Sequence, residues 1–121
     1  MILTILPMEF AVCKLPCVAT ETLTNPFTFY ANTDEEISLL TPAHLVPDGA
    51  LEIETGFRGM RIAGVLDFGL IGIVAKISAI LAEAHISLFV VSTYNTDYFF
   101  VKEENFSRSI TLLTANGYSV Q

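Results

Sequence analysis

The feature of this sequence that most constrains its fold is the order of apolar patterns between Met60 and Val120. The stretch 60–66 has an apolar strand pattern and ends at a turn over 67–69. A helical pattern over 70–84 follows, in which apolar residues fall within an arc of about 120° on one face. The residues of this stripe are Leu70, Ile73, Val74, Ile77, Ile80, Leu81 and Ala84.

Four further elements are predicted after this helix: two strands joined by a tight turn, a second helix and a last short strand. Their expected ranges are 86–94, 97–102, 103–115 and 118–120. Glu103 and Glu104 suit the positive end of the second helix, and Asn116-Gly117 favours its termination. The order βαββαβ predicts an α+β, ferredoxin-like fold, in which two helices cover one face of a four-stranded antiparallel sheet.

The central hairpin of this sheet is apolar on both faces. All residues of 86–91 except Ser87, and all of 98–101, are apolar, whereas a sheet covered on one side only alternates apolar and polar residues. We therefore expect the face away from the helices to be covered, or the sheet edge to be extended by a partner.

The first half of the chain resembles a shortened version of the same order. Strand patterns occupy 8–15, 27–31, 37–41 and 51–57. All five prolines lie in this half, so only short elements fit between these strands. Single helical turns are predicted at Thr33–Glu36, which has the spacing of a capping box, and at Pro42–Leu45. We predict a degenerate half over 1–57 and a complete domain over 58–121, folded together without a linker.

Composition and charge exclude several classes of protein. Charged residues make up 16% of the 121 residues, and mean hydropathy is +0.56, which excludes a disordered chain. The net charge of −7 lies entirely in residues 1–56, so no basic surface favours nucleic acid. The longest uncharged runs, 84–96 and 109–121, are shorter than the roughly 20 apolar residues of a membrane-spanning helix. We expect a soluble cytoplasmic protein.

The sequence offers little for catalysis or for metal binding. It contains no nucleophile elbow, phosphate loop or pair of catalytic carboxylates, so we expect neither an enzyme nor a cofactor. Cys13 and Cys17 are too far apart for a disulfide unless the chain turns between them. Together with His44 and His85 they lack the usual close spacing of zinc ligands, and no metal site is predicted.

Two stretches resemble the ACT domain family. The run Val65–Ile77, VLDFGLIGIVAKI, is similar to the first strand, turn and helix of that family. The run Phe89–Tyr98, FVVSTYNTDY, resembles the subgroup that includes the CASTOR-type cytosolic arginine sensors and many short bacterial proteins. The resemblance covers 58–121 and weakens over 1–57, where the subgroup carries a second, degenerate ACT-like unit. Many ACT domains have Pro where this chain has Phe68, and Gly where it has His85, a residue that tolerates the left-handed conformation.

The resemblance implies a ligand site between two ACT units, which in this short chain requires a second copy of the protein. Carried over by position, the ligand-binding residues are Asp67, Phe68, Gly69, Leu70, Ile71, Ser92, Thr93, Tyr94 and Asp97. The N–H groups of Gly69, Leu70 and Ile71, at a helix N-terminus, suit the carboxylate of an amino acid. Asp67 suits its ammonium group, and Asp97 favours a cationic side chain.

Structural roles remain open for the same residues. Asp67 is equally suited to capping a helix, and Asp97 to closing a hairpin turn. Thr93 and Tyr94 are also ordinary strand residues. The sequence therefore predicts a regulatory or sensory ACT protein that binds an amino acid across a homodimer interface. The alternative is a structural dimerisation module without a ligand.

Overall fold

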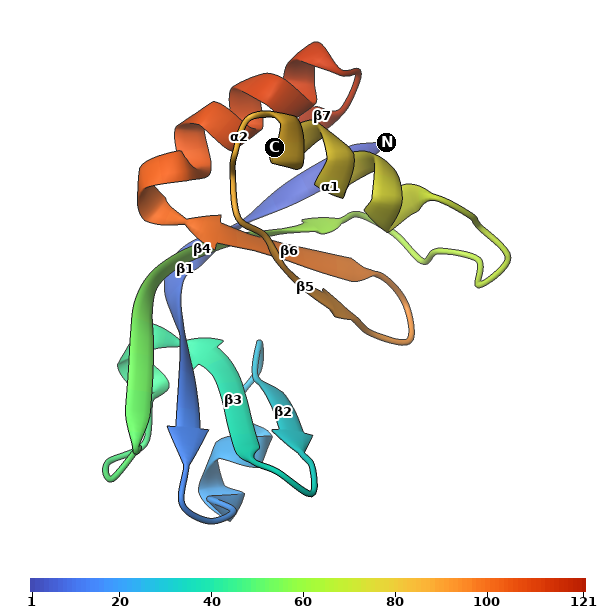
Figure 1. Ribbon diagram of the computed structural model, residues 1–121. Coiled ribbons are helices and arrows are strands. Elements are labelled where there is room, and N and C mark those ends of the chain that lie inside the picture. The colour runs from blue at the N-terminus through green and yellow to red at the C-terminus, as the bar shows by residue number, and fades with distance from the viewer. The chain divides into compact units, whose positions relative to one another are not determined.

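The computed structural model describes residues 1–121 and contains seven strands, two α-helices and two short 3-10 turns (Figure 1). The strands are β1 (Ile2–Leu15), β2 (Phe29–Asn32), β3 (Ile37–Pro42), β4 (Glu52–Ile62), β5 (Phe89–Ser92), β6 (Asp97–Lys102) and β7 (Ser119–Val120). The helices are α1 (Ile73–Glu83) and α2 (Glu103–Ala115), and the 3-10 turns are η1 (Thr20–Thr24) and η2 (Ala43–Leu45). Neither helix has the length and apolar character that crossing a membrane requires.

The chain divides into two compact units. Unit 1 comprises Met1–Pro7 and Arg58–Gln121, and unit 2 comprises Met8–Phe57. Two strands, β1 and β4, run from one unit into the other. The separate strands expected at 51–57 and 60–66 are joined in the single strand β4. The expected range 60–66 was too long: β4 ends at Ile62, before Gly64, which has a left-handed φ of 90°.

Unit 1 has the predicted order of elements from β4 to β7. Its strands lie in the order β7-β1-β4-β6-β5, and the start of β1 pairs in parallel with β7. Helices α1 and α2 cover one face of this sheet (Figure 1). The order is consistent with a ferredoxin-like fold to which β1 adds a strand between the first and last strands of the motif.

The core of unit 1 lies between the helices and the sheet. Phe99 and Val101 of β6 point into it, together with Ile77 and Leu81 of α1. On the opposite face of the same strand, Phe100 is also fully buried. The sheet is therefore covered on both faces at β6, as its two-sided apolar pattern predicts.

Helix α1 begins three residues later than expected. Leu70 donates its N–H to the carbonyl of Asp67, and Gly72 has the left-handed φ of 84°, so residues 70–72 belong to the turn. The apolar stripe of α1 packs as predicted except for Leu70, which is exposed.

At the C-terminal end of α1, His85 adopts the left-handed φ of 58°. The following strand, β5, is shorter than the predicted 86–94 because Ile86 still donates its N–H to the helix carbonyl of Leu81.

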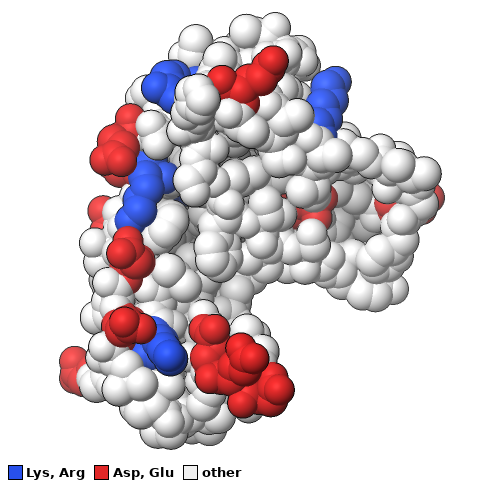
Figure 2. Space-filling model, viewed as in Figure 1, with Lys and Arg blue, Asp and Glu red and all other residues white.

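Unit 2 arranges its strands in the order β2-β3-β1-β4, with a 3-10 turn after β1 and another after β3. The predicted helical turn at Thr33–Glu36 is wrong: these residues form the hairpin turn between β2 and β3. The Thr33 hydroxyl accepts the N–H groups of Glu35 and Glu36, as in a cap, but the chain reverses there instead of coiling. The turn at 42–45 is confirmed as η2. Acidic side chains gather on unit 2 (Figure 2).

Candidate functional site

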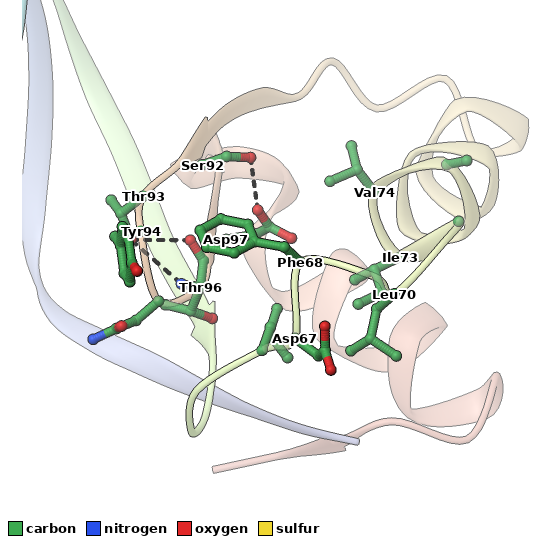
Figure 3. A pocket seen from close by; sticks show the side chains of 14 residues that line it. Asp67, Phe68, Leu70, Ile73, Val74, Ser92, Thr93, Tyr94, Thr96 and Asp97 are labelled. Atoms are coloured by element: carbon green, nitrogen blue, oxygen red, sulfur yellow. Dashed lines mark hydrogen bonds between the residues drawn. The ribbon is translucent and has the colours of Figure 1, made fainter.

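A pocket of about 360 Å³ opens in unit 1, between the turn that leads into α1 and the turn of the β5–β6 hairpin (Figure 3). The first wall comes from residues 66–75, and the second from residues 92–97. The N–H of Leu66 donates to the carbonyl of Asn95 at 2.7 Å, which ties the two walls together. Two segments that residues 76–91 separate in the chain therefore form one concave surface.

The pocket brings together seven of the nine residues predicted from the sequence. These are Asp67, Phe68, Leu70, Ser92, Thr93, Tyr94 and Asp97. The two others, Gly69 and Ile71, do not line it. Gly69 lies within the turn, and the side chain of Ile71 is 96% exposed beside a separate hollow next to Lys76.

Asp67 shapes the first wall. Its Oδ1 accepts the N–H of Gly69 at 2.7 Å, and its carbonyl accepts the N–H of Leu70 at 3.1 Å. The side chain therefore stabilises the turn itself and does not cap α1, whose N-cap residue is Gly72. The Gly69 N–H that the sequence assigned to a ligand carboxylate is already bonded to Asp67.

The first turn of α1 supplies N–H groups that sequence reasoning missed. The first helical hydrogen bond runs from Lys76 to the carbonyl of Gly72, so the N–H groups of residues 73–75 precede it. Ile73, Val74 and Ala75 all line the pocket. The signal for this shift was Gly72, because glycine is favoured at the position before a helix and destabilises a helix interior.

Hydrogen bonds also fix the hairpin wall. The Ser92 hydroxyl donates to Oδ1 of Asp97 at 2.6 Å. The Thr93 hydroxyl donates to the carbonyl of Thr96 at 3.0 Å, and the buried Thr96 hydroxyl donates to the carbonyl of Ile62 in β4 at 2.7 Å. Figure 3 shows these side chains around the turn. The hairpin end is thus anchored to the sheet, and Asp97 is held in the pocket wall.

Two exposed aromatic rings meet across the pocket. Phe68 and Tyr94 come from opposite walls, and their centroids lie 5.1 Å apart in an edge-to-face arrangement. Phe68 is 75% exposed and Tyr94 is 80% exposed. Together with the exposed Leu70 of the same pocket, these two rings form an exposed apolar surface of the kind that marks interaction sites.

The charges of the pocket have one sign. Asp67 and Asp97 line it, and none of its lining residues is Lys or Arg. A cation is therefore favoured beside the carboxylates, while the N–H groups at the start of α1 favour an anion. A molecule with both charges, such as an amino acid, suits this combination.

No group of three or more His, Cys, Asp or Glu side chains is placed to hold a metal ion. Cys13 is buried in unit 2, where burial raises the pKa of its thiol, and Cys17 is exposed. Neither cysteine lines the pocket.

These features define a small α+β module with an open ligand-sized pocket at the turn between its first strand and first helix. The sequence matches the ACT domain family over residues 52–115, more than half of the chain, and the protein belongs to this family. ACT domains typically bind amino acids in regulatory proteins. A search of curated proteins found no match.

Solved structures share the fold at low sequence identity. A protein from Agobacterium tumefaciens has 24% identity and a TM-score of 0.89, with 99% of this chain and 91% of that chain covered. A Vibrio cholerae protein of unknown function has 20% identity and a TM-score of 0.76, covering 92% and 85%. The aspartate kinase from Synechocystis has 18% identity and a TM-score of 0.70. The match covers 98% of this chain but 27% of the kinase.

Proposed function

We propose that this protein is a cytoplasmic regulatory or sensory ACT protein that binds a free amino acid in the pocket of unit 1. One observation carries the proposal: the carboxylates of Asp67 and Asp97 and the residues that begin α1, with their N–H groups, lie around the same open pocket. It acts by binding and not by catalysis, and it falls within the subgroup of the CASTOR-type sensors.

Each group of an amino acid has a suitable partner in this pocket. The α-carboxylate binds the N–H groups of residues 73–75, where the helix dipole adds to the hydrogen bonds. The ammonium group or a cationic side chain binds Asp97, whose position is fixed by Ser92. Phe68 and Tyr94 cover the apolar part of the ligand. A cationic amino acid is the favoured ligand, since it neutralises the surplus carboxylate.

We also propose that the pocket is completed in a homodimer. The exposed side chains around it are large and apolar, which makes them costly to leave in water. A second copy that covers Phe68 and Tyr94 would close the open side of the site. A ligand that binds the closed dimer more tightly than the open form then shifts the population between the two forms.

Unit 2 is proposed to be the degenerate ACT-like half. It has the strand order of the ferredoxin-like motif, with η1 and η2 at the places of the two helices. This would make each chain a tandem of two related units.

One observation favours the alternative, a structural dimerisation module without a ligand. Both pocket carboxylates already accept a hydrogen bond within the chain, Asp67 from Gly69 and Asp97 from Ser92. Two turns with purely structural roles would contain the same two hydrogen bonds, so these bonds do not require a ligand.

A thermal-shift screen against the twenty amino acids separates these functions. A ligand at 100 times its dissociation constant stabilises the protein by about 2.7 kcal/mol. Asp97→Ala is expected to abolish the shift, whereas Asp34→Ala, which removes the same charge from the β2–β3 turn, is expected to keep it. A protein that is dimeric by analytical ultracentrifugation but shifts with no amino acid would contradict the sensor proposal. Normal binding by Asp97→Ala would place the ligand elsewhere.

A further inference from the structure

A second pocket, of about 550 Å³, opens beside the first, and all of its lining residues belong to unit 1. Residues 61–65, at the end of β4 and just beyond it, form one wall. The turn 93–96 forms another and also lines the first pocket, so one hairpin turn contributes to both. Nothing in the amino-acid proposal uses this second pocket.

The charge of the second pocket is opposite to that of the first. Arg61 lines it, and none of its lining residues is Asp or Glu. The first pocket has two aspartates and no base. The two pockets therefore favour ligands of opposite charge, although they share the residues of the hairpin turn.

The guanidinium of Arg61 lies beside the phenol group of Tyr98 in this pocket. Its Nη1 donates to the Tyr98 hydroxyl oxygen at 3.3 Å, and its guanidinium carbon lies 5.9 Å from the centre of the Tyr98 ring. These contacts restrain the guanidinium between the neighbouring inner strands β4 and β6. A planar guanidinium fork next to a hydroxyl group matches the two oxygens of a carboxylate.

We infer that this second pocket binds the carboxylate of a small organic acid with an apolar body. A single guanidinium balances one negative charge, whereas a phosphate group carries about −1.5 to −2 and suits a site with more cations. The side chains of Ala63 and Val65 provide an apolar wall. The carboxylate of the ligand binds Arg61, and the apolar body of the ligand lies against this wall.

Sodium benzoate is the probe, followed by amide chemical shifts of the ¹⁵N-labelled full chain. We expect saturable shifts centred on residues 61–65 and 93–96, and much smaller shifts with benzyl alcohol, which lacks the charge. Arg61→Gln should weaken benzoate binding at least about tenfold, because an ionic hydrogen bond is lost. Arg108→Gln makes the same charge change on α2, outside the pocket, and should bind as the parent does. Asp97→Ala should also retain binding.

Several outcomes would overturn the inference. These are the absence of saturable shifts, equal shifts with benzyl alcohol, tighter binding of inorganic phosphate, or unchanged binding by Arg61→Gln. Shifts centred instead on residues 73–75, at the start of α1, would place the anion in the first pocket. If Arg61→Gln does not fold, Arg61→Lys serves instead: it keeps the charge but loses the fork, and undiminished binding by that variant contradicts the proposed role. A failure here leaves the amino-acid site untouched, because the two tests use different probes and variants.

Discussion

The hydroxyl of Ser92 donates a hydrogen bond of 2.6 Å to Oδ1 of Asp97, and the two residues are directly paired at the end of β5 and the start of β6. The last rung of the hairpin thus holds a carboxylate in the wall of the first pocket. A carboxylate has a second oxygen, so Oδ2 can accept a hydrogen bond from a ligand while Oδ1 is held.

Ser92→Ala tests this positioning role. Loss of one hydrogen bond is worth about 0.5–1.5 kcal/mol, so we expect ligand affinity to fall about two- to tenfold. Stability should change little because Ser92 is exposed. Calorimetric titration with the amino acid found in the screen measures the change. Ser87→Ala, an exposed serine outside the pocket, is the control, and an equal loss in both variants would contradict the role of Ser92.

Thr96→Val tests how the hairpin turn is anchored. The variant keeps the side-chain shape but removes the donor to the Ile62 carbonyl, a buried bond of 2.7 Å. We expect a loss of about 1–3 kcal/mol in the free energy of unfolding by urea, since that carbonyl is left without this partner. Thr111→Val, which removes an exposed hydrogen bond from a hydroxyl group on α2, should lower the free energy of unfolding much less. Similar losses for the two variants would contradict the anchoring role.

Local patterns predicted most of unit 1 because each element there has its own signal. The end of α1 is an example: His85 and Ile86 form the left-handed exit and the bond back to Leu81 that terminate a helix. The start of α1 was misplaced because Leu70 fits the apolar stripe, and the period of a helix does not reveal a left-handed Gly72.

Long-range pairing was beyond sequence reasoning. The parallel pairing of Ile2 and Leu3 with β7 joins residues more than 100 positions apart, and no local pattern records it. The same limit applies to the site. Resemblance to the family placed Asp67 and Asp97 near one pocket, but the contribution of Thr96 depends on a bond to Ile62 in another strand.

Gly59→Ala tests the close contact between β4 and β6. A Cβ atom at Gly59 would lie 2.6 Å from a ring carbon of Phe100, and both residues are buried. We expect a loss of about 1–3 kcal/mol in the free energy of unfolding, as for other overpacked sites. Phe100→Leu in the Gly59→Ala background should recover part of the lost free energy of unfolding. A double-mutant cycle measures this coupling between the two positions. An additive cycle would show that the ring does not cause the loss.

The two cysteines should differ in reactivity. Burial raises the pKa of the Cys13 thiol, so at pH 8 a smaller fraction of it is the reactive thiolate. Cys17 is exposed. We expect Ellman's reagent to modify Cys17 at least about tenfold faster than Cys13, with the slow phase accelerating as pH rises. Cys17→Ser should remove the fast phase only. A single fast phase for both thiols would contradict the burial of Cys13.

Ile71→Asp tests the proposed dimer without changing the first pocket. The Ile71 side chain is 96% exposed and does not line that pocket, although it lies in the same turn as Phe68 and Leu70. Burying an isoleucine is worth about 1.5–3 kcal/mol, and an aspartate at an apolar interface adds a desolvation cost. We expect the dimer dissociation constant in sedimentation equilibrium to rise at least about tenfold. Leu23→Asp changes an exposed leucine in unit 2 and should leave it unchanged. If Ile71→Asp dimerises as the parent does, the surface around the pocket is not the dimer interface, and the ligand site must be completed within one chain.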